Sequence, residues 1–98
     1  MTVKTTKNND ALLIALEGRL DTTTAPQLDA ELKGSLDGIT SLTFDLERLE
    51  YISSAGLRSL LAAQKVMNKQ GKMEIRHVNE MIMEIFEVTG FVDILSIG

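Results

Sequence analysis

Two adjacent serines, Ser53 and Ser54, lie in the stretch LEYISSAGLRSLL, between an apolar run and residues with helical spacing. A serine oxygen in this position can accept a backbone N–H and begin a helix, which is worth roughly 1 kcal/mol. A serine hydroxyl can also be phosphorylated here, because the first turn of a helix offers free N–H groups and a partial positive charge. The spacing alone favours a capping role for these serines, and phosphorylation is the alternative interpretation.

A second polar stretch, GRLDTTT, covers residues 18–24 and also follows an apolar run. Its Asp21 is interpreted from spacing as a turn or capping carboxylate. In open α/β sheets, ligands and partners meet the loops beyond the carboxyl ends of the strands. If the two polar loops are neighbours, Asp21 lies near Ser54, where a carboxylate could orient the hydroxyl or disfavour a nearby phosphate.

Other polar or sulfur-containing residues suggest less chemistry. Asp45 lacks the acidic pair and the lysine that receiver domains need, so we expect it to tie down a loop at a strand end. His77 is the only histidine and is in phase with an apolar strand, which predicts a partly buried structural residue and no metal site. Met81 belongs to a helical apolar stripe and is expected in the core, whereas Met83 falls outside the stripe and is expected at the surface.

Composition and motifs argue against several classes of function. The chain has no cysteine, no Walker loop, no GxGxxG, no GxSxG and no serine with an available histidine base. We therefore expect that the protein is not an enzyme and that it binds no cofactor and no metal. The formal net charge of −4 disfavours nucleic acid and anionic membranes as partners, which leaves another protein.

The length of 98 residues predicts one domain, residues 1–98. The longest apolar run, Ala11 to Leu16, is too short to span a bilayer, and the first ten residues have no apolar core of a signal peptide. A cytoplasmic protein is the expectation.

Apolar periodicity predicts strands alternating with helices. Strands are expected at residues 3–6, 11–16, 42–46, 72–78 and 92–97, and helices from Thr24 to Gly38, from the two serines to Gly71 and from Asn79 to Gly90. The threonines and lysine of the first strand predict that it lies at an edge of the sheet. The unbroken apolar run of the second strand predicts a central strand that is covered on both faces. The expected fold is α/β, a mostly parallel sheet of about four to five strands with helices packed on it.

The sequence resembles the STAS domain family, and within it the stand-alone anti-sigma-factor antagonists of bacteria. The resemblance covers nearly the whole chain and rests on SLTFDLERLEYISSAGLRSLL, LEGRLDTTTAPQL and NEMIMEIFEVTGF. It implies that Ser54 is the family's phosphorylated serine, that Gly56 and Leu57 are the Gly-Leu pair after it, and that Asp21 is a loop aspartate near the acceptor. Ser53 stands where many members have Asp and is the second choice for the acceptor.

The resemblance also implies a partner switch. The unphosphorylated domain binds an anti-sigma factor, a GHKL-type serine kinase, and frees the sigma factor. The kinase uses ATP and Mg²⁺ to phosphorylate the serine, and a metal-dependent Ser/Thr phosphatase reverses this. The residues expected to bind the partner lie in the two loops and the following helix turn: Asp21, Thr22, Thr23, Ser53, Ser54, Ala55, Gly56, Leu57 and Arg58.

Two other functions stay open. One is a non-phosphorylated adaptor subunit of an ABC-type lipid transport system, as some STAS-like subunits are, with the serines serving as a cap. The other is a sensor of a small ligand such as a nucleotide or lipid. Family members commonly carry another helix after the last strand, and the sequence ends at Gly98, so the resemblance does not extend to contacts made by that helix.

Overall fold

The computed structural model describes residues 1–98 and contains the predicted alternation of strands and helices. In chain order the elements are β1 (Thr2–Asn8), β2 (Ala11–Leu20), α1 (Ala25–Leu32), β3 (Ser41–Ile52), α2 (Ser54–Gln70), β4 (Lys72–Arg76), α3 (Glu80–Thr89) and a short 3₁₀ helix, η1 (Phe91–Asp93). None of the helices combines the length and the apolar character needed to cross a bilayer.

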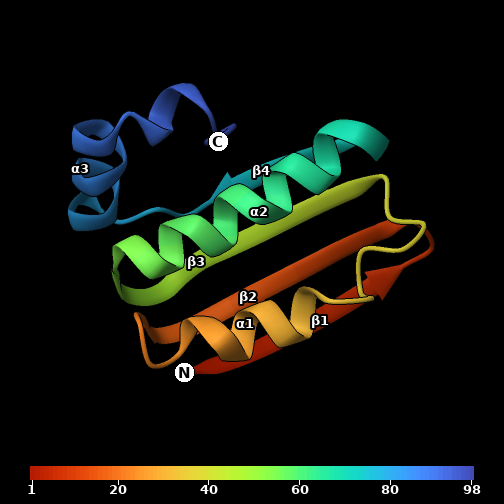
Figure 1. Ribbon diagram of the computed structural model, residues 1–98, viewed down its shortest axis with the longest axis horizontal. Helices are drawn as coiled ribbons and strands as arrows, with labels where there is room; N and C mark the ends of the chain where they lie inside the picture. Colours follow the sequence, from red (N-terminus) through yellow and green to blue (C-terminus); the bar gives the residue numbers. More distant parts are fainter.

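The four strands form one sheet in the order β1-β2-β3-β4. β1 and β2 are an antiparallel hairpin, whereas β3 runs parallel to both β2 and β4. α1 and α2 are the crossovers between parallel strands and lie on the same face of the sheet (Figure 1). This follows from two crossovers of one hand that move in one direction along the sheet. The predicted α/β fold with a mostly parallel sheet is confirmed, with four strands.

The opposite face of the sheet carries neither α1 nor α2. Alternate residues of β2 are buried against the helices, and Leu13, between the buried Leu12 and Ile14, is 39% exposed. The prediction that residues 11–16 are covered on both faces is therefore wrong. The reason is that helices on one face only leave a period-two burial pattern, which an unbroken apolar run such as ALLIAL hides.

α3 packs at the β4 side of the sheet and is held there by both its side chains and its cap. Ile82 and Phe86 are fully buried in the core. The side chain of Asn79 accepts a hydrogen bond from the Ile82 N–H at 2.8 Å and donates one to the Leu49 carbonyl of β3 at 2.9 Å. Gly90 ends the helix in the left-handed conformation, with φ of 80°. The predicted start and end of this helix are confirmed.

The first helix and the last strand differ most from their predicted bounds. α1 ends at Leu32 rather than Gly38, because the chain turns at Gly34 with a φ of 85°, and Leu36 is buried from the turns that follow. Residues 92–97 do not form a strand. Most of that segment belongs to η1 and the turn after it, and only its end reaches the sheet. Ile97 forms a parallel bridge to Ile75, whose N–H donates to the Ser96 carbonyl at 2.8 Å and whose carbonyl accepts the Gly98 N–H at 2.9 Å.

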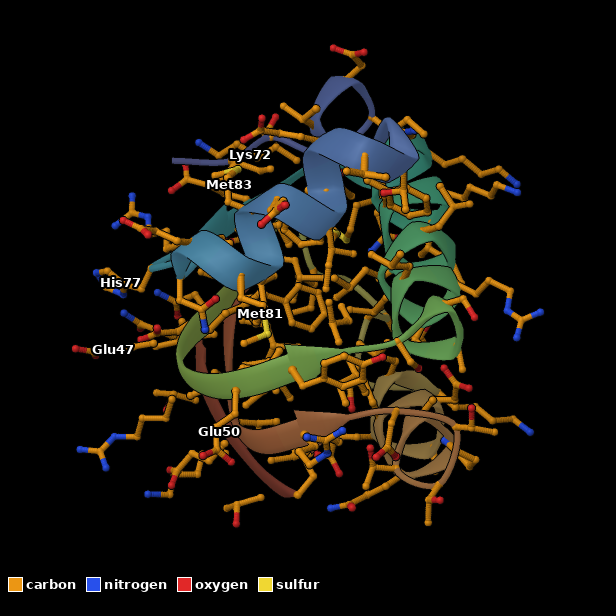
Figure 2. All side chains as sticks on the ribbon, turned by 90° about the vertical axis from the view of Figure 1, so that its left-hand side faces the viewer. Glu47, Glu50, Lys72, His77, Met81 and Met83 are labelled. Atoms are coloured by element: carbon orange, nitrogen blue, oxygen red, sulfur yellow. The ribbon has the colours of Figure 1, made fainter.

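The two methionines of α3 also differ from expectation. Met81 is 55% exposed and Met83 is half-buried, so the prediction that Met81 lies in the core is wrong. The buried line of the helix passes through Ile82 and Phe86, four residues apart, and Met81 lies beside it. Figure 2 shows Met81 at the end of the molecule where α2 begins.

Candidate functional site

β2 and β3 end side by side, and this brings the two polar loops together. Leu20 pairs with Ile52 in the parallel register, and the Ser53 N–H donates to the Leu20 carbonyl at 2.9 Å. Two register shifts place extra residues in β3 and bring its end level with that of β2. The neighbouring loops that the sequence analysis considered are therefore present, at the end of the molecule that faces the viewer in Figure 2.

The two serines have different positions at the start of α2. Ser53 is the N-cap, with extended backbone, and its Oγ accepts a long hydrogen bond of 3.5 Å from the Gly56 N–H. Ser54 is the first helical residue, is exposed, and makes no side-chain hydrogen bond within the protein. The N–H groups of Ser54 and Ala55 have no partner in the protein. The positive end of α2 is thus open beside the Ser54 hydroxyl.

The residues after the serines fit α2 against the strand ends. Gly56 is buried, and a Cβ atom there would lie 2.7 Å from Leu20 Cγ and 2.8 Å from Ile52 Cγ1. Leu57 is buried in the core. Glycine lets the first turn of α2 approach both strands closely, which fixes where the Ser54 hydroxyl emerges.

Asp21 organises its own turn. Its Oδ1 accepts the N–H groups of Thr23 at 3.0 Å and Thr24 at 3.1 Å, and Arg19 Nε lies 3.7 Å from its Oδ2. The Thr24 N–H bond is the largest cause that holds the pKa of Asp21 below its ordinary value of 3.8. Desolvation opposes it, and the Thr23 N–H, the Thr24 hydroxyl and the charge of Arg19 act in the same direction as the Thr24 N–H. Asp21 makes no hydrogen bond with Ser54.

Arg19 and Tyr51 complete this end of the sheet and were not singled out by the sequence analysis. They pair in the β2–β3 register, and the Arg19 guanidinium lies 4.5 Å from the centre of the Tyr51 ring. Together with its ion pair to Asp21, this stacking makes Arg19 a link between the two loops. The sequence offers no signal for the pair, since their alignment depends on the register shifts.

A groove of about 580 Å³ runs between α1 and α2 from the same loops. Three residues predicted to bind a partner, Thr22, Ala55 and Arg58, line one end of it. Thr23 is exposed on the loop outside the groove. The apolar lining comes from both helices and the turn after α1: Ala25, Pro26, Leu32, Leu36, Ala62, Ala63 and Val66.

Asp45 and His77 lie away from this groove, on the face of the sheet that α1 and α2 leave open. The His77 side chain is 60% exposed, so the prediction of a partly buried histidine is wrong. β4 ends at Arg76, two residues before the predicted end at Val78, and the left-handed backbone of His77, with φ of 59°, breaks the alternation of buried and exposed side chains. Asp45 lies within β3 and not at a strand end as predicted, and it accepts the N–H of Glu47, two residues along the same strand, at 3.0 Å. His77 Nδ1 lies 3.0 Å from the same oxygen, Asp45 Oδ1.

The sequence model of the STAS domain matches residues 2–98. The chain belongs to the STAS domain family. This STAS domain is 41% identical over 92 residues to BtrV of Bordetella bronchiseptica, which is named as an anti-sigma factor antagonist. The match covers 91% of this chain and 79% of BtrV.

Solved structures share the fold of this STAS domain. An anti-sigma factor antagonist from Mycobacterium paratuberculosis superimposes with a TM-score of 0.88 at 21% identity, covering 98% of this chain and 83% of that one. The anti-sigma factor antagonist SpoIIAA in its unphosphorylated form gives 0.78 at 16% identity, covering 99% and 87%. The phosphorylated form of SpoIIAA, from Bacillus, gives 0.77 at 17% identity, covering 99% and 91%. At these identities the likeness shows the fold alone.

Proposed function

We propose that this STAS domain is a cytoplasmic anti-sigma-factor antagonist. Its unphosphorylated form binds an anti-sigma factor that is a GHKL-type serine kinase, and this binding releases the sigma factor. The name of BtrV, a 41% identical relative, supports the antagonist role, and the two phosphorylation states of SpoIIAA support a phosphate switch. The domain acts by binding and serves the kinase as a substrate, so it needs no catalytic groups of its own.

The exposed Ser54 hydroxyl at the start of α2 is the observation that carries the proposal. In the reaction, Ser54 Oγ forms a bond to the γ-phosphorus of ATP while the bond to ADP breaks, and the kinase supplies the ATP and Mg²⁺. A metal-dependent phosphatase hydrolyses the phosphoserine and restores the hydroxyl. The unpartnered N–H groups of Ser54 and Ala55 can donate to the phosphate, so the fold tolerates it.

We expect the phosphate to weaken the complex with the kinase and not the fold of the domain. Phosphoserine adds about −1.5 to −2 charges at the centre of the two loops that we assign to the kinase interface. Each 1.4 kcal/mol or so lost from an interface weakens it about tenfold. Desolvating a dianion against a fitted surface costs several times that amount, which is enough to release the kinase.

The test is mass spectrometry of the protein after incubation with the kinase, ATP and Mg²⁺. We expect one phosphate, located on Ser54. Ser54→Ala should take up no phosphate and still bind the kinase with an affinity close to that of the wild type. Ser53→Ala is the matched control and should be phosphorylated.

Three results would contradict the proposal in different ways. Full phosphorylation of Ser54→Ala with none of Ser53→Ala would move the acceptor to Ser53. Phosphorylation of Ser54 without any loss of kinase affinity would remove the switch. The absence of both phosphate and kinase binding, together with pull-down of a transporter ATPase, would favour the permanent adaptor.

The groove between α1 and α2 favours one second candidate, a small-ligand sensor. Its volume of about 580 Å³ is within the range of small-molecule sites, and its lining is largely apolar. A nucleotide or lipid that binds there should raise the melting temperature, and Ala62→Phe, which fills the groove, should abolish the rise. A flat response to both ligand classes would eliminate this candidate.

A further inference from the structure

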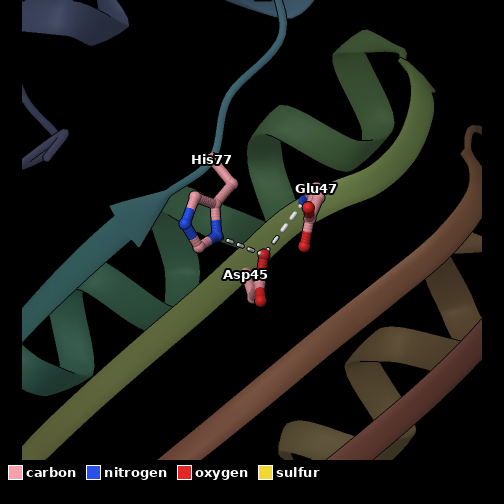
Figure 3. A group of neighbouring side chains, drawn as sticks. All are labelled: Asp45, Glu47 and His77. Atoms are coloured by element: carbon pink, nitrogen blue, oxygen red, sulfur yellow. Dashed lines mark hydrogen bonds and ion pairs between the residues drawn. The ribbon is translucent and has the colours of Figure 1, made fainter.

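Three potential metal ligands gather on the open face of the sheet, remote from the two polar loops. Asp45, Glu47 and His77 each offer one ligand atom, and these atoms all lie within 4.8 Å of one another. Figure 2 shows Glu47 and His77 on the side of the molecule away from α1 and α2, and Figure 3 shows the His77 ring turned toward Asp45 with Glu47 beside Asp45. We propose that Asp45, Glu47 and His77 bind a divalent transition-metal ion of the zinc type.

The backbone brings the three residues together at the point where β3 and β4 separate. Asp45 and Arg76 are the last pair of the β3–β4 ladder. His77 follows at once, and its left-handed backbone, with φ of 59°, interrupts the strand beside Asp45. Glu47 is two residues along β3, and its N–H bonds to Asp45 Oδ1. The ligands therefore come from β3 and from the residue that directly follows β4, its neighbour in the sheet.

The donor set selects the class of metal. One imidazole nitrogen with two carboxylates suits Zn²⁺ and its neighbours in the first transition row, whereas Mg²⁺ and Ca²⁺ prefer oxygen ligands alone. With bonds of about 2.0–2.2 Å, two ligand atoms of a tetrahedral zinc site are about 3.3 Å apart. The observed 3.0 Å between His77 Nδ1 and Asp45 Oδ1 needs a shift of only a few tenths of an ångström.

Glu47, the third protein ligand, can reach the metal by a change of rotamer. Glu47 is exposed, and its carboxylate has neither an ion pair nor a hydrogen bond in the protein, so it can turn toward the other two ligands. Water would complete the coordination, since the three protein ligands leave a fourth position open.

The charges around the cluster favour a cation. With a neutral imidazole, Asp45 and Glu47 together carry two negative charges. The nearby Arg76 is paired with Glu74, and Lys4 is paired with Glu17. Arg48, in the hollow beside Asp45 and Glu47, is the one neighbouring cation without an ion pair. Its long side chain is exposed, so it can swing into solvent when the metal binds.

The test is a titration of the whole chain with Zn²⁺ that is monitored by calorimetry and by NMR of the histidine ring. Because His77 is the only histidine, its ring signals report on this site alone. We expect one equivalent of Zn²⁺ to shift these signals and to raise the melting temperature, and Mg²⁺ to do neither. His77→Ala and Asp45→Asn should each weaken Zn²⁺ binding at least tenfold.

Matched controls separate the site from general binding to acidic side chains. Glu50→Gln removes an exposed carboxylate of β3 outside the cluster and should bind Zn²⁺ like the wild type. Arg48→Gln should bind it at least as tightly. Circular dichroism without metal must show that each variant is folded, and Asp45→Asn retains an oxygen to accept the Glu47 N–H.

Two results would overturn the proposal. One is the absence of any change in the His77 ring signals at millimolar Zn²⁺. The other is equal Zn²⁺ affinity in the wild type and His77→Ala. Neither result depends on Ser54, so the metal site and the phosphate switch are tested independently of each other.

Discussion

Ser53 and Ser54 carry the same hydroxyl but differ in what surrounds it. The Ser53 oxygen is directed at the Gly56 N–H and begins α2, whereas the Ser54 hydroxyl faces solvent from the first helical position. A phosphate on Ser53 would disrupt the cap. A phosphate on Ser54 would leave the cap in place and gain two free N–H donors. Position relative to the helix end thus separates the structural serine from the proposed substrate.

Gly56→Ala should destabilise the fold although alanine is the better helix former. The new methyl group would lie within 3 Å of Leu20 Cγ and Ile52 Cγ1. Overpacking should cost about 1–3 kcal/mol and the gain in helix propensity is about 1 kcal/mol, so the free energy of unfolding should fall by up to about 2 kcal/mol. Urea denaturation measures this, with the exposed Lys65→Ala on the same helix as a control that should change little. An alanine variant more stable than the wild type would show that α2 can move outward freely.

Asp21→Asn should lower stability in a pH-dependent way. The folded-state pKa of Asp21 lies below 3.8, so the unfolded chain takes up the proton more readily as the pH falls. The stabilisation is thus fully present above the unfolded pKa and is lost as the pH falls through the folded one. The urea midpoints of the wild type and the variant should differ most near neutral pH and converge as the pH falls below 3.8. A gap that stays constant across this range would mean that Asp21 acts through shape alone.

At the scale of elements, the sequence predicts the features that depend on residues close together in the chain, such as the ends of helices. Asn79 and Gly90 mark the two ends of α3, and the structure has them in those roles. The sequence analysis raised the adjacency of the two polar loops only as a condition, and the pairing of Leu20 with Ile52 at the ends of β2 and β3 fulfils that condition. The predicted strand at 92–97 was wrong because its sequence is apolar enough for either outcome, and the turn at Gly90 leads into η1.

The remaining details depend on register and burial between distant elements. The stacking of Arg19 on Tyr51 requires two register shifts, for which the sequence offers no signal. The exposure of His77 depends on where β4 stops, and that of Met81 on how α3 is rotated against the core. For this reason the sequence does not predict the contact between Asp45 and His77.

The caps of α2 and α3 should differ in strength. Asn79 makes a 2.8 Å cap bond and a second bond to β3, whereas the cap bond of Ser53 is 3.5 Å long. Asn79→Ala should cost roughly 1.5–2 kcal/mol of unfolding free energy and Ser53→Ala about 0.5 kcal/mol. Chemical denaturation of both variants measures the difference. An equal or reversed order would contradict the argument from bond geometry.

At the scale of the whole molecule, the two proposed sites lie on different surfaces. The groove and polar loops belong to the helical side and end of the sheet, and the proposed metal ligands belong to the open face. Because the sheet between them is a packed unit, a charge added at Ser54 should not disturb the fold behind it.

Ser54→Asp tests that independence. A carboxylate in the first turn of α2 interacts favourably with the helix dipole, so the unfolding free energy should stay equal or rise by up to about 0.5 kcal/mol. The affinity for the kinase should nevertheless fall at least tenfold. Denaturation and calorimetric binding to the kinase measure the two quantities, with Ser54→Ala as the uncharged control. Loss of binding accompanied by loss of stability would mean that the variant disturbs the fold and not the interface alone.

The strand order β1-β2-β3-β4 has a consequence for how the chain folds during synthesis. Each strand is added beside the one made before it, so no strand has to insert between two that are already paired. The β1–β2 hairpin can form as soon as it leaves the ribosome, and each later helix-and-strand unit extends a sheet edge that already exists. A nascent chain cut short after β3 would therefore hold three strands in native order, with an edge ready for β4.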